Sequence, residues 1–308
     1  MKRFVRTLNV VISSVILAPS MAFAQEHAES REIDIMHHLG NSRFLEIPYW
    51  KAPYSREIAL PQFPPVHLGP VTIDFSVTKH LVFLMAAAIL VALAFVHTGR
   101  VVRRAEAAGK PPRGLGGALE AMSLFIRNEV VIPNVGHHGE KYVPYLLTVF
   151  FFVLVCNLLG LLPWGSTATG NIAVTGAMAL LSFLVIEVSG MRSLGFKGYM
   201  HTIFYLPPGL PGPLKPIMLA IMTPVEVISK LSKPFALAVR LFANMTAGHV
   251  VVLALIGLTF FFKSALVGAG SAVLATAIMG LELFVAFLQA FVFTLLTSVF
   301  IGLIRESH

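Results

Sequence analysis

The stretch that decides the fold is residues 265–304, ALVGAGSAVLATAIMGLELFVAFLQAFVFTLLTSVFIGLI, in which Glu282 is the single formally charged residue. A membrane-spanning helix needs about 20 apolar residues. If this run were wholly helical it would be about 60 Å long, at about 1.5 Å per residue. The preceding run, 236–262, is also longer than one span requires. We therefore expect two long helices that are strongly tilted or kinked in the hydrocarbon layer.

The composition agrees with a membrane protein. Hydrophobic residues make up 56% of the 308 positions and charged residues only 12%, against about 25% in a soluble domain. The single cysteine, Cys156, excludes a disulfide scaffold, and the apolar content excludes intrinsic disorder. The net charge of +8 is interpreted as lysine and arginine at a membrane surface, and no nucleic-acid partner is expected.

Three further apolar runs give five predicted spans, at about 80–98, 144–164, 171–190, 217–262 and 265–304. Between the first two spans, about 114–131, apolar residues recur at helical spacing: Leu115, Leu119, Met122, Ile126 and Val130. This pattern predicts an amphipathic helix on the membrane surface, and a soluble helix packed on a loop is the alternative. The predicted fold class is all-α integral membrane, with five transmembrane helices and one amphipathic surface helix.

The first residues have the pattern of a secretory signal peptide. A basic head precedes a short apolar run, and Ala22-Phe23-Ala24 resembles a cleavage signature. We predict a signal peptide at 1–24, with an uncleaved anchor as the alternative, a periplasmic arm at 25–76 and a membrane domain at 77–308. Basic residues crowd the loop after the first span, which places the N-terminus in the periplasm and the C-terminus in the cytoplasm.

Several ionisable residues lie within or beside the apolar runs, where a charge is costly and usually functional or paired. Glu282 and Arg240 lie well inside the last two runs, and a structural ion pair between them is one interpretation. Glu187 lies near the end of the third span, where either snorkelling to the interface or a functional role is open. Glu226 lies toward the cytoplasmic end of the fourth span.

The neighbours of these charges favour a polar pathway. Arg240, Asn244 and Gly248 follow at steps of four and share one helix face, with His249 immediately after. Glu282 and Gln289 are seven residues apart and share a face of the next helix. Because glutamate and histidine can relay protons when their surroundings are tuned, two facing helices of this kind suit proton transfer.

These residues carry a resemblance. The stretch PVEVISKLSKPFALAVRLFANMTAGH at 224–249, followed by LELFVAFLQAFVFTLLTSVFIG at 281–302, resembles subunit a of the F-type ATP synthase. The resemblance implies a proton-translocating stator that is no enzyme by itself and needs no cofactor or metal. It implies a place in the bacterial cell inner membrane. The implied partners are the ring of c subunits, the b-subunit peripheral stalk, the other synthase subunits, protons and the lipid bilayer.

The resemblance also implies roles for single residues. Arg240 corresponds to the stator charge that faces the ring carboxylate, and Asn244 and Gln289 to polar residues near it. His249 and Glu282 correspond to the periplasmic half-channel pair, although many bacterial members have the acid and the imidazole exchanged. Glu226 corresponds to the cytoplasmic half-channel acid, with an interfacial pair to Lys230 at i+4 as its alternative.

Two other classes stay open at this point. An ion-coupled secondary transporter could use Arg240 and Glu282 as a substrate site, although no internal repeat is evident. A metal enzyme is suggested only by the doublets His37-His38 and His137-His138, without an accompanying metal-binding motif.

Overall fold

The computed structural model describes residues 42–48, 55–64, 66–68, 71–74, 76–136, 138–162, 167–204, 211, 214–262 and 264–306. The chain divides into two units, Met1–Ser42 and Arg43–His308, and the description below concerns the second. The predicted signal peptide lies outside the described residues, as do His37, His38 and His137.

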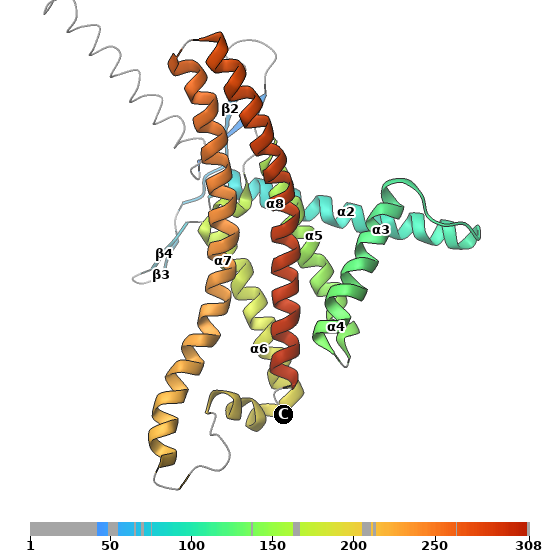
Figure 1. Ribbon diagram of the computed structural model, residues 1–308, viewed down its shortest axis with the longest axis vertical. Coiled ribbons are helices and arrows are strands. Elements are labelled where there is room, and N and C mark those ends of the chain that lie inside the picture. Colours follow the sequence, from blue (N-terminus) through green and yellow to red (C-terminus); the bar gives the residue numbers. More distant parts are fainter. Residues whose placement is uncertain are drawn as a thin grey trace, which may run out of the picture. The chain divides into compact units, whose positions relative to one another are not determined.

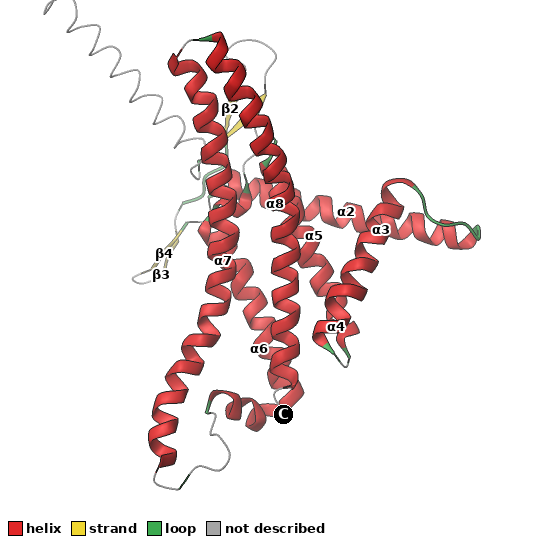
Figure 2. Cartoon of the chain, in the orientation of Figure 1, coloured by secondary structure: helices red, strands yellow, loops and turns green. Residues whose placement is uncertain are grey.

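Helices dominate the described part of the chain, as Figures 1 and 2 show. They are α2 (Lys79–Ala107), α3 (Gly114–Phe125), the π-helix η1 (Ile126–Val131), α4 (Ile132–Val135), the 3-10 helix η2 (Gly139–Tyr142), α5 (Val143–Gly160), the 3-10 helix η3 (Ala168–Gly170), α6 (Ile172–Ile203), α7 (Lys215–Phe262) and α8 (Ala265–Glu306). Within the described residues, five helices are long and apolar enough to cross a membrane: α2, the helix ending at Gly160, α6, α7 and α8. The predicted all-α membrane fold is therefore confirmed.

The two long helices α7 and α8 contact each other along part of their length. They contain 48 and 42 residues and are joined by a short connection. They lie close near that connection and diverge toward the N-terminal end of α7 (Figure 1). Pro224 and Pro234 lie inside α7, where each removes a backbone N–H donor and weakens the helix against bending.

Helix α6 is broken at Gly195. This residue has φ 70° and ψ 169°, a conformation that glycine adopts without the steric penalty of a side chain. The segment after Gly195 consequently runs in a different direction from the rest of α6 (Figure 1). The break decides which side chains of α6 meet, as the site below shows.

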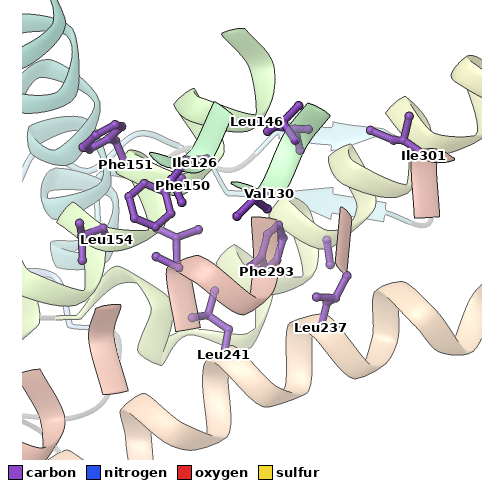
Figure 3. Packing of buried hydrophobic residues seen from close by; sticks show 14 of the residues in the cluster. Ile126, Val130, Leu146, Phe150, Phe151, Leu154, Leu237, Leu241, Phe293 and Ile301 are labelled. Atoms are coloured by element: carbon purple, nitrogen blue, oxygen red, sulfur yellow. The ribbon is translucent and has the colours of Figure 1, made fainter. Parts of the chain in front are cut away.

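The predicted amphipathic segment is helical from Gly114 to Val135, but it changes character along its length. Leu115 at its start is 71% exposed, whereas Ile126 and Val130 are fully buried. Ile126 and Val130 join the main apolar cluster with Phe150 of α5 and Phe293 of α8 (Figure 3). The second half of the segment is thus part of the core, whereas the sequence pattern predicts a surface position throughout.

The arm contains two β-hairpins, which the sequence analysis does not predict. β1 (Phe44–Pro48) pairs antiparallel with β2 (Ser55–Ala59), and β3 (Val66–Leu68) with β4 (Val71–Ile73). After β4, the Ser76 hydroxyl and backbone N–H, together with Arg43, hold the pKa of the Asp74 carboxyl below its ordinary value. The all-α description therefore applies to the membrane domain alone.

The end of α8 packs tightly on α4. A β-carbon added at Gly302 would lie 1.9 Å from the backbone oxygen of Asn134, and Arg305 donates to the backbone oxygen of Val135 at 3.2 Å. The Asn134 oxygen belongs to the backbone and cannot move aside as a flexible side chain could. The two helices can therefore approach this closely only if residue 302 has no side chain.

We predict that Gly302→Ala destabilises the chain by about 1–3 kcal/mol through overpacking. Thermal unfolding of the full chain in detergent is followed by reaction of the buried Cys156, the only cysteine, with a fluorogenic thiol reagent. Gly270→Ala is the matched control, because a β-carbon there meets nothing within 4 Å. Equal midpoints for the two variants would contradict the packing described here.

Candidate functional site

Two polar clusters lie at different levels along α7. One is built around His249 and the other around Lys230 and Glu226. His249 and Glu226 are 23 positions apart in the sequence, which is about 35 Å along a continuous helix. Arg240 lies between them, about 14 Å from the level of His249.

The first cluster joins α7, α8 and the segment before η3. His249 Nδ1 lies 3.3 Å from Glu282 Oε1, and His249 Nε2 lies 2.6 Å from the Thr167 hydroxyl. A neutral imidazole with its proton on Nδ1 donates to the carboxylate and accepts from Thr167, whereas an imidazolium donates on both sides. The imidazole can therefore bridge Thr167 and Glu282 in either protonation state.

Two glycines make room for this cluster. A β-carbon at Gly248 would lie 1.9 Å from Glu282 Oε1, and one at Gly160 would lie 1.7 Å from the Thr167 hydroxyl oxygen. The absence of both side chains lets the glutamate cross to α7 and lets Thr167 reach His249. Gly248, identified in the sequence as one member of a polar face, thus has a steric role.

A second layer of hydrogen bonds fixes the segment that carries Thr167. The Thr169 hydroxyl donates to Asn157 Oδ1 at 2.7 Å, and Asn157 Nδ2 donates to the backbone oxygen of Ala286 at 3.3 Å. Asn157 is fully buried in α5, and Ala286 lies one turn after Glu282 on α8. α5, η3 and α8 are therefore tied together beside the His249–Glu282 pair.

Arg240 lies on an exposed face of α7. Among the described residues it forms no hydrogen bond or ion pair, and Glu282 pairs with His249 instead. The structural Arg240–Glu282 ion pair considered above is therefore not formed. Asn244, one turn away, is also exposed, and the exposed neighbours on this side of α7 are small: Ala236, Ala243 and Ala247. A flat face of this kind suits close approach of another helix.

The inner face of α7 at the level of Arg240 is apolar. Its buried residues are Leu237, Ala238, Leu241 and Met245. On α8, Gln289 is buried, and the hydroxyl of Thr294 is used within its own helix, donating to the backbone oxygen of Ala290 at 2.9 Å. Gln289 thus lies inside the packed helices, whereas Arg240 and Asn244 lie on the exposed side.

The second cluster surrounds a cavity of about 210 Å³ between α6, α7 and α8. Lys230 Nζ lies 3.6 Å from Glu187 Oε2, and both side chains are mostly buried. Glu187 also accepts a hydrogen bond from the Tyr199 hydroxyl. Glu226 lines the same cavity but forms no hydrogen bond or ion pair with any described residue. The i+4 pair between Glu226 and Lys230, the alternative considered above, is not formed, because Lys230 pairs with Glu187. Glu187 thus points inward instead of snorkelling.

Sequence reasoning missed Thr167, Asn157 and Tyr199 as members of these clusters, and it considered Lys230 only as an alternative partner of Glu226. Asn157 gave one usable signal, because it is a lone amide in an otherwise apolar run. Thr167 and Tyr199 gave none, since their contacts depend on the packing of Thr167 against α7 and on the break in α6.

The fold and the two clusters define a multi-pass membrane protein that holds ionisable groups inside its apolar helices. Comparison with known proteins identifies the family within this class. A family model described as ATP synthase A chain matches residues 68–302. The similar curated proteins include ATP synthase subunit a 2 of Chlorobaculum tepidum, which is 42% identical over 304 residues, covering 97% of this chain and 81% of the relative.

Two more relatives give the same family. ATP synthase subunit a of Pelodictyon phaeoclathratiforme is 43% identical over 305 residues, covering 97% of this chain and 84% of its own. The subunit a of Myxococcus xanthus is 47% identical over 234 residues, covering 75% of this chain and 73% of its own. The chain belongs to the ATP synthase A chain family. It is thus a membrane subunit of the ATP synthase class, with a role in proton-linked ATP synthesis.

We predict that Gly248→Ala impairs ATP-driven proton pumping by about tenfold or more, because displacing a reacting group by about 1 Å can cost up to 100-fold. The new β-carbon would overlap Glu282 and push it away from His249. The assay uses inverted membrane vesicles, with pumping normalised to the assembled complex. Gly257→Ala on the same helix is the control, since a β-carbon there meets nothing within 4 Å. Similar pumping by both variants would rule out the steric role of Gly248.

Proposed function

We propose that this chain is the proton-translocating stator subunit of an F-type ATP synthase, with two offset half-channels that deliver protons to and from the carboxylates of a c-subunit ring. The observation that carries the proposal is the position of Arg240. It lies on an exposed face of α7, without a partner among the described residues, between two polar clusters.

The apolar inner face of α7 between the clusters supports an external route for the proton. Leu237 and Leu241 fill the inner face of α7 at this level, and apolar packing offers no hydrogen-bonded path for a proton. A proton that reaches one cluster would therefore continue through a carboxylate on a partner helix. The small exposed residues beside Arg240 would let that helix approach.

Arg240 acts in this scheme as a fixed positive charge. At about 4 Å and an effective dielectric constant near 20, it would attract a passing carboxylate by about 4 kcal/mol. This attraction favours the ionised carboxylate and hence release of its proton, yet remains weak enough for the pair to separate. Arginine suits the role because its guanidinium does not lose its own proton. Asn244 would orient Arg240 or a water molecule on the exposed side, and the buried Gln289 would act from within the packed helices.

The two clusters receive distinct roles. His249 and Glu282 form the relay of the periplasmic half-channel, and Glu226 is the acid of the cytoplasmic half-channel, with Glu187 in the same cavity. This assignment follows the orientation expected from the basic loops, with the chain in the bacterial inner membrane. We further propose the b-subunit peripheral stalk as a second partner, and a non-catalytic role for the chain itself.

We predict that Arg240→Ala abolishes ATP-driven proton pumping in inverted membrane vesicles while the complex still assembles, because the substitution removes an exposed charge without disturbing core packing. Assembly is checked by co-purification with the c ring. Arg192→Ala, which removes another exposed arginine, on α6, is the control and should pump normally. Normal pumping by an assembled Arg240→Ala complex would falsify the proposed role of Arg240.

A further inference from the structure

The cavity between α6, α7 and α8 contains two acids and two lysines: Glu187, Glu226, Lys230 and Lys233. Glu226 precedes Lys230 by four positions on α7, the spacing and order at which a glutamate and a lysine on a helix pair most readily. The Glu226–Lys230 pair is nevertheless not formed, because both lysines contact other groups.

Lys230 is held by three groups of α6. Its ammonium lies 3.6 Å from the Glu187 carboxylate, donates to the Thr202 hydroxyl at 3.0 Å and lies 4.6 Å from the centre of the Tyr199 ring. These contacts satisfy the ammonium with an anion, an oxygen acceptor and an aromatic face.

The arrangement depends on the break in α6. Glu187 and Tyr199 are 12 residues apart and would be separated by about 18 Å along a straight helix. The backbone conformation at Gly195 turns the segment that follows in a different direction, so the Tyr199 hydroxyl donates to Glu187 and Thr202 reaches Lys230.

The second lysine of the cavity, Lys233, also contacts a group other than Glu226. Lys233 lies seven positions after Glu226, on the same helix face, but its ammonium is positioned over the Phe300 ring of α8, 5.0 Å from the centre. Among the described residues Glu226 is therefore left without a cationic partner, although two lysines line its cavity.

We propose that Glu187 is a positioning residue that competes with Glu226 for Lys230 and thereby keeps Glu226 able to bind and release protons. This inference rests on the proposed role of Glu226 in the cytoplasmic half-channel. A neighbouring ammonium favours the ionised form of a carboxylate. A Glu226–Lys230 pair would hold Glu226 ionised and slow its protonation from the cytoplasm, the step that ATP-driven pumping requires.

The charged groups that face Glu226 define the pH dependence. From α7 these are Lys230 and Lys233, and from α6 it is Glu187, whose carboxylate accepts from Tyr199. The α8 residues that line the cavity, Phe300, Leu303 and Ile304, carry no charge. When Glu187 loses its charge, Lys230 is expected to turn to Glu226.

The test measures the initial rate of ATP-driven proton pumping against pH in inverted vesicles, normalised to assembled complex. Glu187→Gln should lower the rate at neutral pH about tenfold and shift the pH profile about one unit toward acid, as expected for a lysine beside a carboxylate. In the Glu187→Gln background, adding Lys230→Met should restore most of the pumping rate and return the pH profile to that of the unmodified chain. Adding Lys197→Met instead, at an exposed lysine of α6, should do neither. Glu187→Asp keeps the charge with a shorter reach and should give a smaller acid shift.

A deficit in Glu187→Gln that does not change with pH, or equal rescue by Lys197→Met, would overturn the inference in favour of a packing defect. Glu226→Gln separates this inference from the function on which it rests. Impaired pumping by Glu226→Gln beside normal pumping by Glu187→Gln overturns the positioning role alone. Normal pumping by Glu226→Gln overturns the proposed role of Glu226, and with it the inference.

Discussion

The cost of holding a charge inside apolar helices is the constraint on which this structure depends. An ionisable group at membrane depth either finds a partner or serves a function that requires its charge. Glu282 is paired with His249, and Glu187 with Lys230. Arg240 and Glu226 have no partner among the described residues, although Glu226 lines the cavity that holds the Glu187–Lys230 pair. The unpaired groups are thus the ones for which a mobile partner, a ring carboxylate or a proton, is proposed.

Features that follow from local sequence patterns could be predicted from the sequence. Run length alone predicts the five apolar helices, and helical spacing predicts that Arg240 and Asn244 share a face. The pairing of His249 with Glu282 was expected from the family resemblance, since the residue pattern alone also allowed an Arg240–Glu282 pair. The interpretation of Glu226 as a partner of Lys230 failed, because a helical spacing rule describes one helix and takes no account of a competing acid on the next.

The features beyond sequence reasoning all depend on contacts between segments that are separated in the sequence. The Glu187–Tyr199 contact exists only because Gly195 breaks α6, and a glycine within a helical segment does not by itself predict a break. Thr167 reaches His249 only because Gly160 leaves space beside it. The burial of Ile126 and Val130 likewise requires that α5 and α8 cover the end of a segment whose composition is typical of a membrane surface.

The two clusters illustrate different uses of the same chemistry. In the first, an acid and an imidazole contact each other directly and share Thr167 as a further hydrogen-bond partner, which suits a relay. In the second, an acid and a lysine are satisfied by a neighbouring tyrosine and threonine, which suits a permanent pair. In the proposed scheme, the permanent pair occupies an ammonium that would otherwise pair with Glu226 and hold it ionised. In the positioning role proposed above, the charge of Glu187 matters to transport because it keeps Lys230 away from Glu226.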